Sequence, residues 1–378
     1  MGILTLLLVF GLMGPLLARS KLLALPVAVG EIAIGAVFGE SGFNLVPVND
    51  QVLTFVSQVG FALVMMMVGS HIDIRALAKS GMLNRAIRNV ALMAVAALAL
   101  AFVFEAIGGL GLTWLFAVLI FSSSAAVILP TLNKSELSKY SLLTSQIAIA
   151  DLVSILVLPL AINRTQMLST AIGALLIAAL SLMVFFMVRY LSQKGITKKV
   201  RAESKERGFG LELRVSLITL LGIATLATQF GVTVLVAGFG VGLALAANGV
   251  PRRLAKQLFA VTEGFFAPVF FVMLGAQIDV QAALANPGML MLAAAIFTGA
   301  LIVHLVPVLF GFKPAQAVAS MAQLGVPAAA VSIGQATGLL SAGQAAAIML
   351  AALSSILASV LALRTMTAKA ISKKQKSK

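Results

Sequence analysis

Long apolar stretches, separated by short polar connections, recur along the whole chain and constrain its fold more than any other feature. Hydrophobic residues make up 61% of the 378 positions and charged residues only 10%, and the mean hydropathy is +1.09. Soluble domains are roughly half apolar and about a quarter charged. A chain this apolar cannot cover a water-facing surface, which excludes a soluble enzyme, a disordered chain and a plain nucleic-acid binder.

A helix that crosses a bilayer needs about 20 mostly apolar residues. We predict thirteen such helices, at 2–18, 21–39, 52–69, 87–107, 111–130, 141–163, 168–190, 210–228, 231–248, 258–276, 288–309, 314–335 and 341–363. If the C-terminus is cytoplasmic and the N-terminus outside, every Lys and Arg except Arg164 lies inside or at an inner helix end, as the positive-inside rule requires. The formal charge of +15 then reflects membrane orientation.

The first six and the last six predicted helices match one another in order. Residues 68–74 and 274–280, for example, both read apolar-Gly-x-x-Ile-Asp-apolar. Seven crossings separate each element from its mate, because the helix at 168–190 stands between the halves. Since seven is odd, the two halves have opposite orientations in the membrane. We therefore predict an all-α polytopic membrane protein of two inverted six-helix repeats with a linking helix, a ground plan common among secondary transporters. Asp73 and Asp279, just past helix ends, are expected to cap or orient the chain.

Asp151 lies near the middle of the sixth predicted helix, and its mate in the second half is Ala352. An acidic residue at that depth is a functional candidate, because charge in the hydrocarbon core is unfavourable. Removal from water favours the protonated carboxyl, so Asp151 could hold a proton or a small cation but not both, and that competition produces obligatory exchange. The structural alternative is a buried, protonated Asp bonded to a neighbouring helix.

Helix-breaking residues occur in the fifth and the twelfth predicted helices, which are mates in the repeat. Serine clusters compete for backbone hydrogen bonds, and Gly and Pro interrupt helices, so both spans are expected to unwind within the membrane. Unwound backbone at that depth lines a cavity or is buried in protein, and paired discontinuous helices point to a transport site. The predicted site comprises Asp151, the hydroxyls of Ser123 and Ser124, and the helix-break backbone at Ala125, Pro130, Gln323, Gly325 and Pro327.

Three further polar residues lie within predicted spans. Glu31 and Glu263 are assigned gating or structural roles, since neither is as central as Asp151. His304, in the eleventh helix, could pair with a carboxylate or satisfy a neighbouring carbonyl, and the residues alone slightly favour the second interpretation.

Three stretches together resemble the monovalent cation:proton antiporter-2 family, which includes bacterial sodium/proton antiporters and Kef-type potassium/proton systems. Residues 30–39 match its Gly-Glu-rich second helix, 122–129 its Ser-rich fifth helix, and 268–279 its Pro-x-Phe-Phe-x-x-x-Gly-x-x-x-Asp stretch. The similarity covers essentially the whole membrane region. It implies the sodium/proton antiporter fold, in which two discontinuous helices cross in a core bundle that moves, elevator-like, against a dimerisation domain.

The resemblance also implies roles for individual residues and segments. Asp151 matches the family's ion- and proton-carrying aspartate, and Ala150 replaces the acidic, Asn or Gln residue that usually precedes it, which favours electroneutral exchange. His304 falls where the family often has Lys, and we expect it to modulate the proton affinity of Asp151. Val326 stands where Kef-like members often have Glu, which leaves the transported ion open. The implied segments are scaffold helices in 1–86 and 210–287, core transport helices in 87–163 and 288–364, a linker helix and basic loop in 164–209, and a basic cytoplasmic tail in 365–378.

The sequence thus predicts a transporter, not an enzyme, that exchanges Na⁺ or K⁺ for H⁺ without a cofactor in the inner membrane of a prokaryote. Its expected partners are membrane lipid and a second copy of the chain, with no nucleic acid and no cytosolic regulatory domain in this chain. The main alternative is a sodium-coupled organic-anion symporter on a similar scaffold. A cation channel lined by Asp151 is less favoured, and an intramembrane protease lacks both a second facing aspartate and a His-Glu-x-x-His helix.

Overall fold

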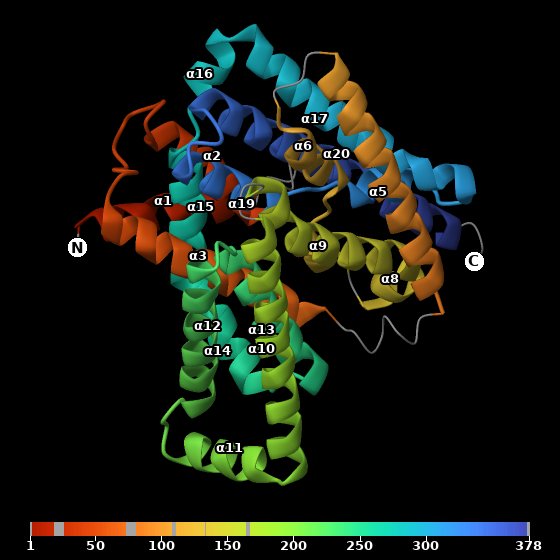
Figure 1. The fold of residues 1–378 in the computed structure, drawn as a ribbon. Helices are drawn as coiled ribbons and strands as arrows, with labels where there is room; N and C mark the ends of the chain where they lie inside the picture. The colour runs from red at the N-terminus through yellow and green to blue at the C-terminus, as the bar shows by residue number, and fades with distance from the viewer. Residues whose placement is uncertain are drawn as a thin grey trace.

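Every regular element that the structure describes is a helix (Figure 1). The computed structural model describes residues 2–18, 26–72, 81–107, 111–132, 134–163 and 167–375, so Asp73 and Arg164 lie outside the described residues. The helices up to the middle of the chain are α1 (Gly2–Ala18), α2 (Val27–Phe38), α3 (Gln51–His71), α5 (Leu83–Ala106), α6 (Thr113–Phe121), α7 (Ala125–Ile128), the 3₁₀ turn η1 (Leu129–Thr131), α8 (Lys134–Lys139), α9 (Ser141–Ile162) and α10 (Met167–Gln193). The remaining helices are α11 (Ile196–Glu206), α12 (Leu211–Gln229), α13 (Val234–Asn248), α14 (Arg252–Val261), the π-helical turn η3 (Thr262–Phe266), α15 (Ala267–Ala276), α16 (Val280–Ala285), α17 (Pro287–Leu305), the 3₁₀ turn η4 (Val306–Phe310), α18 (Pro314–Ser320), α19 (Gly325–Ala336) and α20 (Ala342–Gln375).

Within the described residues, nine helical segments are long and apolar enough to cross a membrane. They are Gln51–His71, Leu83–Ala106, Ser141–Ile162, Met167–Gln193, Leu211–Gln229, Arg252–Ala285, Pro287–Phe310, Pro314–Ala336 and Ala342–Met366. The chain is therefore a multi-pass membrane protein. Four shorter apolar segments, Gly2–Ala18, Val27–Phe38, Thr113–Ile128 and Val234–Asn248, fall in the other predicted spans. The total of thirteen crossings and the inverted repeat stay predictions.

Several predicted connections are helical in the structure, among them the one that contains α14. Residues 250–257 read as a basic loop, but α14 begins at Arg252 and continues through η3 into α15. The reason is that α14 is amphipathic: Leu254 and Leu258, four residues apart, are buried, while Arg252 and Lys256 face outward. Residues four apart share one helix face, so a charged segment can remain helical at the end of a span.

Helices α2 and α15 approach one another closely through glycine. On α2 and α15 the contact is reciprocal, because a Cβ on Gly35 would collide with the carbonyl oxygen of Val272, and one on Gly275 with that of Ile32. Small residues at such crossings let two membrane helices pack backbone to backbone. Gly35 and Gly275 both belong to the motifs quoted above, and the structure gives those positions a packing role.

The basic helix α11 joins the ends of α10 and α12, at the bottom of the view in Figure 1. Arg201 on α11 pairs with Glu212 on α12 at 2.7 Å, and the hydroxyl of Ser204 accepts a hydrogen bond from the backbone N–H of Leu211. These contacts hold α11 against the start of α12.

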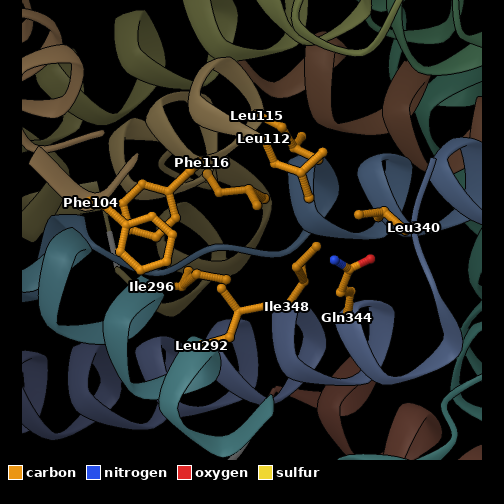
Figure 2. Close-up of a pocket in the computed structure, with 10 residues that line it drawn as sticks. Phe104, Leu112, Leu115, Phe116, Leu292, Ile296, Leu340, Gln344 and Ile348 are labelled. Carbon is orange, nitrogen blue, oxygen red and sulfur yellow. The ribbon is translucent and has the colours of Figure 1, made fainter. Parts of the chain in front are cut away.

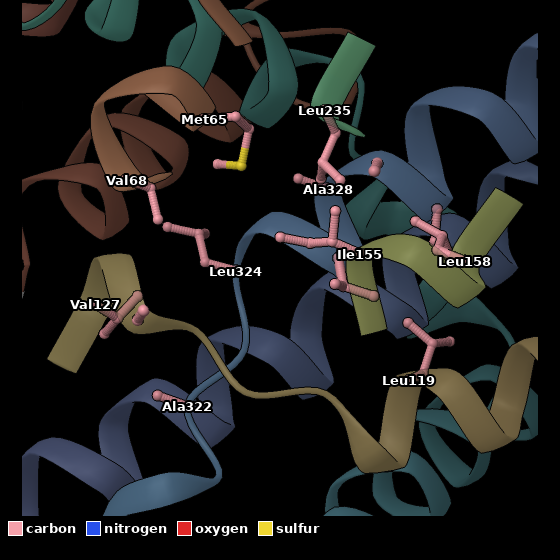
Figure 3. Packing of buried hydrophobic residues seen from close by; sticks show 14 of the residues in the cluster. Met65, Val68, Leu119, Val127, Ile155, Leu158, Leu235, Ala322, Leu324 and Ala328 are labelled. Carbon is pink, nitrogen blue, oxygen red and sulfur yellow. The ribbon is translucent and has the colours of Figure 1, made fainter. Parts of the chain in front are cut away.

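Two membrane helices are interrupted, as predicted. The first ends as α6 at Phe121 and resumes as α7 at Ala125, and the second ends as α18 at Ser320 and resumes as α19 at Gly325. Figure 3 shows the unwound chain between Leu119 and Val127 passing beside that between Ala322 and Leu324. Most side chains around them are buried and apolar, so the interruptions lie inside the helical bundle.

Candidate functional site

Asp151 lies on α9 beside the first interruption. Its side chain is only 4% exposed, and Oδ2 accepts a hydrogen bond of 2.9 Å from the backbone N–H of Ala125. Ala125 is the first residue after the break, and the N–H groups at a helix start have no acceptor within their own helix. No described residue donates a hydrogen bond to Oδ1. One carboxyl oxygen is therefore fixed to the break, and the other is available to a proton or a cation.

The three serines of the first break make different contacts. Ser122 donates back to the carbonyl oxygen of Leu119 at 3.0 Å, whereas Ser123 donates across the crossing to the carbonyl oxygen of Ser320 at 2.8 Å. Ser124 is buried, and its hydroxyl bonds to no described residue. Of the two predicted hydroxyl ligands, Ser123 is thus engaged in joining the two breaks, while Ser124 keeps its oxygen free.

The second break is held by α20. The backbone N–H of Gln323 donates to Ser355 Oγ at 3.1 Å, and that hydroxyl donates to the carbonyl oxygen of Ala352 at 2.6 Å. The side chain of Gln323 is also buried, and its Nε2 meets no acceptor among the described residues. Gln323 therefore places an unsatisfied amide within the interruption.

The glycine and prolines that predicted the breaks lie just after them. Gly325 begins α19, Pro327 lies in its first turn, and Pro130 lies in the 3₁₀ turn η1, so the interruptions themselves are Ser122–Ser124 and Met321–Leu324. Proline is tolerated in a first turn because the N–H that it lacks would have no acceptor there. Gly325 and Pro327 start the second half of one interrupted helix, whereas Pro130 follows α7 at the end of the other, and none of the three lies in an unwound segment.

His304 is fully buried and lies next to Ser123. Its Nδ1 is 2.8 Å from the carbonyl oxygen of Ala300, and its Nε2 is 3.3 Å from Ser123 Oγ. Because a carbonyl only accepts, Nδ1 carries a hydrogen. On a neutral ring Nε2 is then an acceptor, and it shares the single hydroxyl hydrogen of Ser123 with Ser320. His304, the expected partner of Asp151, therefore forms no direct hydrogen bond with that residue. In this conformation the two are linked only through the segment from Ser123 to Ala125.

Glu31 and Glu263 lie apart from these contacts. Glu31 is buried on α2 against Gly14 of α1, and Glu263 lies in the π-helical turn η3. The two carboxyls interact electrostatically with each other, and neither bonds to Asp151. Their gating or structural role stays a prediction.

Three polar residues next to the site were missed in the sequence. Asn89 on α5 donates from Nδ2 to Gln146 Oε1 at 2.9 Å, and Gln146 Nε2 lies 3.4 Å from Ser320 Oγ. All three side chains are almost completely buried. The available signal was an amide within a predicted membrane helix, which has to find a hydrogen-bonding partner.

A separate pocket of about 20 Å³ lies between α5, α6, α17 and α20 (Figure 2). Its lining is apolar apart from Gln344, whose Oε1 already accepts a hydrogen bond from the backbone N–H of Ser341 at 2.9 Å. The pocket holds no titratable group, and Asp151 does not line it. It is therefore part of the packing and not of the site.

The fold and the site together define a class, a multi-pass membrane transporter with a buried carboxyl at crossed helix interruptions. A profile of the family described as "Sodium/hydrogen exchanger, transmembrane" matches residues 5–369, and the chain belongs to this family. The predicted resemblance to monovalent cation:proton antiporters is thereby confirmed.

One curated relative supports the same assignment. The Bacillus subtilis (strain 168) protein named "Putative Na(+)/H(+) antiporter YjbQ" is 23% identical over an alignment of 371 residues, which covers 91% of this chain. The chain spans 59% of the length of that relative.

Proposed function

We propose that the protein exchanges a monovalent cation, Na⁺ or K⁺, for H⁺ across the inner membrane of a prokaryote, with Asp151 as the carrier of both. The observation that carries the proposal is the carboxyl of Asp151, buried at a helix break with Oδ2 bonded to the N–H of Ala125 and Oδ1 without a protein donor. Membership of the exchanger family supports cation/proton antiport, and the name of the Bacillus relative supports Na⁺ as the cation.

Exchange follows from competition at one carboxyl group. A proton on Asp151 removes the negative charge that attracts the cation, and a bound cation opposes protonation. Each occupant must therefore leave on one side before the other can replace it. Ala150, the neighbour of Asp151, adds no second carboxyl, and this supports the exchange of one proton for one monovalent cation, which is electroneutral.

The cation would be held by oxygen atoms at the first break. Small hard cations prefer oxygen ligands, and the oxygens closest in sequence to Ala125 are the hydroxyl of Ser124 and the carbonyl groups of the unwound segment. The remaining backbone of the two breaks, including Gln323, would complete the lining. The cation is the transported substrate, and the proposed cycle uses no cofactor.

Alternating access would come from elevator-like movement of the helices that carry the breaks. Hydrogen bonds join the first break and α7 to α9, α17 and α18, and the second break to α20, which supports their movement as one body. The scaffold would be the close-packed α1–α3 and α12–α15, through which two copies would dimerise. The distribution of Lys and Arg supports a cytoplasmic C-terminus.

Transport by purified protein in proteoliposomes tests the proposal. A pH gradient should collapse when Na⁺ or K⁺ is added, without a membrane potential, and Asp151→Asn should reduce this to background because an amide cannot exchange a proton for a cation. Asp279→Asn is the matched acidic control and should keep wild-type exchange. Full activity of Asp151→Asn would overturn the assignment, and sodium-coupled uptake of a carboxylate with no proton movement would identify a symporter instead.

A further inference from the structure

A buried oxygen atom near the proposed carrier has no hydrogen-bond donor. Asn89 is 1% exposed, and its Nδ2 donates to Gln146 Oε1 at 2.9 Å, but its Oδ1 has no partner among the described residues. Buried polar atoms are nearly always hydrogen-bonded to protein or ordered water. An amide oxygen left in this state can accept a hydrogen bond from water or coordinate a cation.

The hydrogen bonds of the neighbouring polar groups are all directed elsewhere. Gln146 Nε2 lies 3.4 Å from Ser320 Oγ and 3.4 Å from Met93 Sδ, and Ser320 Oγ donates to the carbonyl oxygen of Ala317 at 2.8 Å. No described side chain or backbone N–H is directed at Asn89 Oδ1. The missing partner is therefore a water molecule or a cation.

The amide pair lies between the carrier and one face of the membrane. Gln146 precedes Asp151 by five residues on α9, about 7.5 Å along the helix axis at 1.5 Å per residue. Ser320, which Gln146 contacts, ends α18 and accepts the hydrogen bond from Ser123. Asn89 is thus next to the crossing, on the side where α9 begins, which is the cytoplasmic side of the proposed orientation.

We propose that Asn89 Oδ1, together with the oxygen atoms of Gln146 and Ser320, forms a second station for the transported cation on the cytoplasmic side of Asp151. Carbonyl oxygens can replace part of the hydration shell of a monovalent cation, and Na⁺ and K⁺ favour such oxygen ligands. An amide oxygen does not bind a proton at physiological pH. The station therefore serves the cation and not H⁺, whereas Asp151 serves both. This inference rests on the proposed exchange function.

The test compares Asn89→Leu, which removes the oxygen at nearly constant side-chain shape, with Asn248→Leu. Asn248 is a partly buried asparagine that bonds to the carbonyl oxygens of Phe185 and Ala244, outside this cluster. In everted and right-side-out vesicles, Asn89→Leu should raise the KM for Na⁺ or K⁺ at least tenfold from the cytoplasmic face only. Its pH profile should match the wild type, and Asn248→Leu should leave both KM values unchanged.

A binding measurement covers the case in which Asn89→Leu is poorly folded in vesicles. Purified Asp151→Asn should still show a thermal midpoint that rises with Na⁺ or K⁺ concentration, and the added Asn89→Leu change should abolish that rise. Four results would each overturn the station and leave Asn89 a water-binding or positioning residue. They are unchanged KM values, an equal increase in KM from both faces, a shifted pH profile, and no cation-dependent rise in the thermal midpoint of Asp151→Asn. Those results would not affect the exchange function, which fails if Asp151→Asn retains transport or if the wild type moves no protons.

Discussion

Ser123 in the first interrupted helix donates a hydrogen bond of 2.8 Å to the carbonyl oxygen of Ser320, the last residue before the second interruption. A carbonyl at a helix end has no donor within its own helix. The side chain of one break thus satisfies the backbone of the other. Because Ala125, two residues after Ser123, is held by Asp151, the same short segment links the crossing to the proposed carrier.

Ser123→Ala should destabilise the protein by about 1–3 kcal/mol, because it leaves a buried carbonyl oxygen without a donor. It should also slow exchange, since the crossing loses the bond that joins its two breaks. Ser122→Ala is the matched control, because that hydroxyl bonds only to its own helix. Thermal unfolding in detergent and proteoliposome flux measure the two effects, and equal effects of the two variants would contradict a special role for Ser123.

Two substitutions of His304 should shift the pH optimum of exchange in opposite directions. If His304 takes up a proton while Asp151 is ionised, its positive charge favours the ionised acid, and His304→Ala should then move the pH optimum of exchange upward. His304→Lys, whose amine is more basic than imidazole, should move it downward. The readout is the pH profile of cation-induced proton flux. If both variants lose stability but keep the wild-type profile, the role of His304 is confined to its bonds with Ala300 and Ser123.

Gly275→Ala should destabilise the protein by roughly 1–3 kcal/mol, because the added methyl group overpacks the contact with the Ile32 carbonyl. Gly264→Ala is a suitable control, since a Cβ there meets no atom within 4 Å and alanine is the better helix former. The difference between their thermal midpoints checks the prediction. A tolerated Gly275→Ala would mean that α2 and α15 can move apart freely.

Asp279 accepts a hydrogen bond of 2.8 Å from the N–H of Ala282 and so caps α16, which confirms the capping role predicted for it. Asp279→Ala should therefore cost about 1 kcal/mol of stability and leave the KM for the cation unchanged. Asp279→Ser, which retains a capping oxygen, should restore most of the stability. An increased KM in both variants would instead place Asp279 on the ion path.

Much of the site could be predicted because the membrane restricts what a sequence can contain. Asp151 is conspicuous as an acid among apolar residues, and Ser122–Ser124 and Gly325 to Pro327 are conspicuous as helix breakers. The exact unwound residues were harder to predict. Gly325 and Pro327 lie in the first turn of α19, which accepts residues that the interior of a helix does not, and Pro130 lies in the 3₁₀ turn that follows α7.

The sequence by itself determined that this chain crosses a membrane, and it singled out one carboxyl and two interrupted helices, because hydropathy and helix breaking are local properties. Only the tertiary structure decided which groups meet. His304 contacts Ser123, Ser123 contacts Ser320, and Asn89 contacts Gln146. These residues come from α5, α9, α17, α18 and the break after α6. Buried polar atoms must find partners in three dimensions, and the packing of whole helices, not the spacing of residues, sets which partners lie within reach.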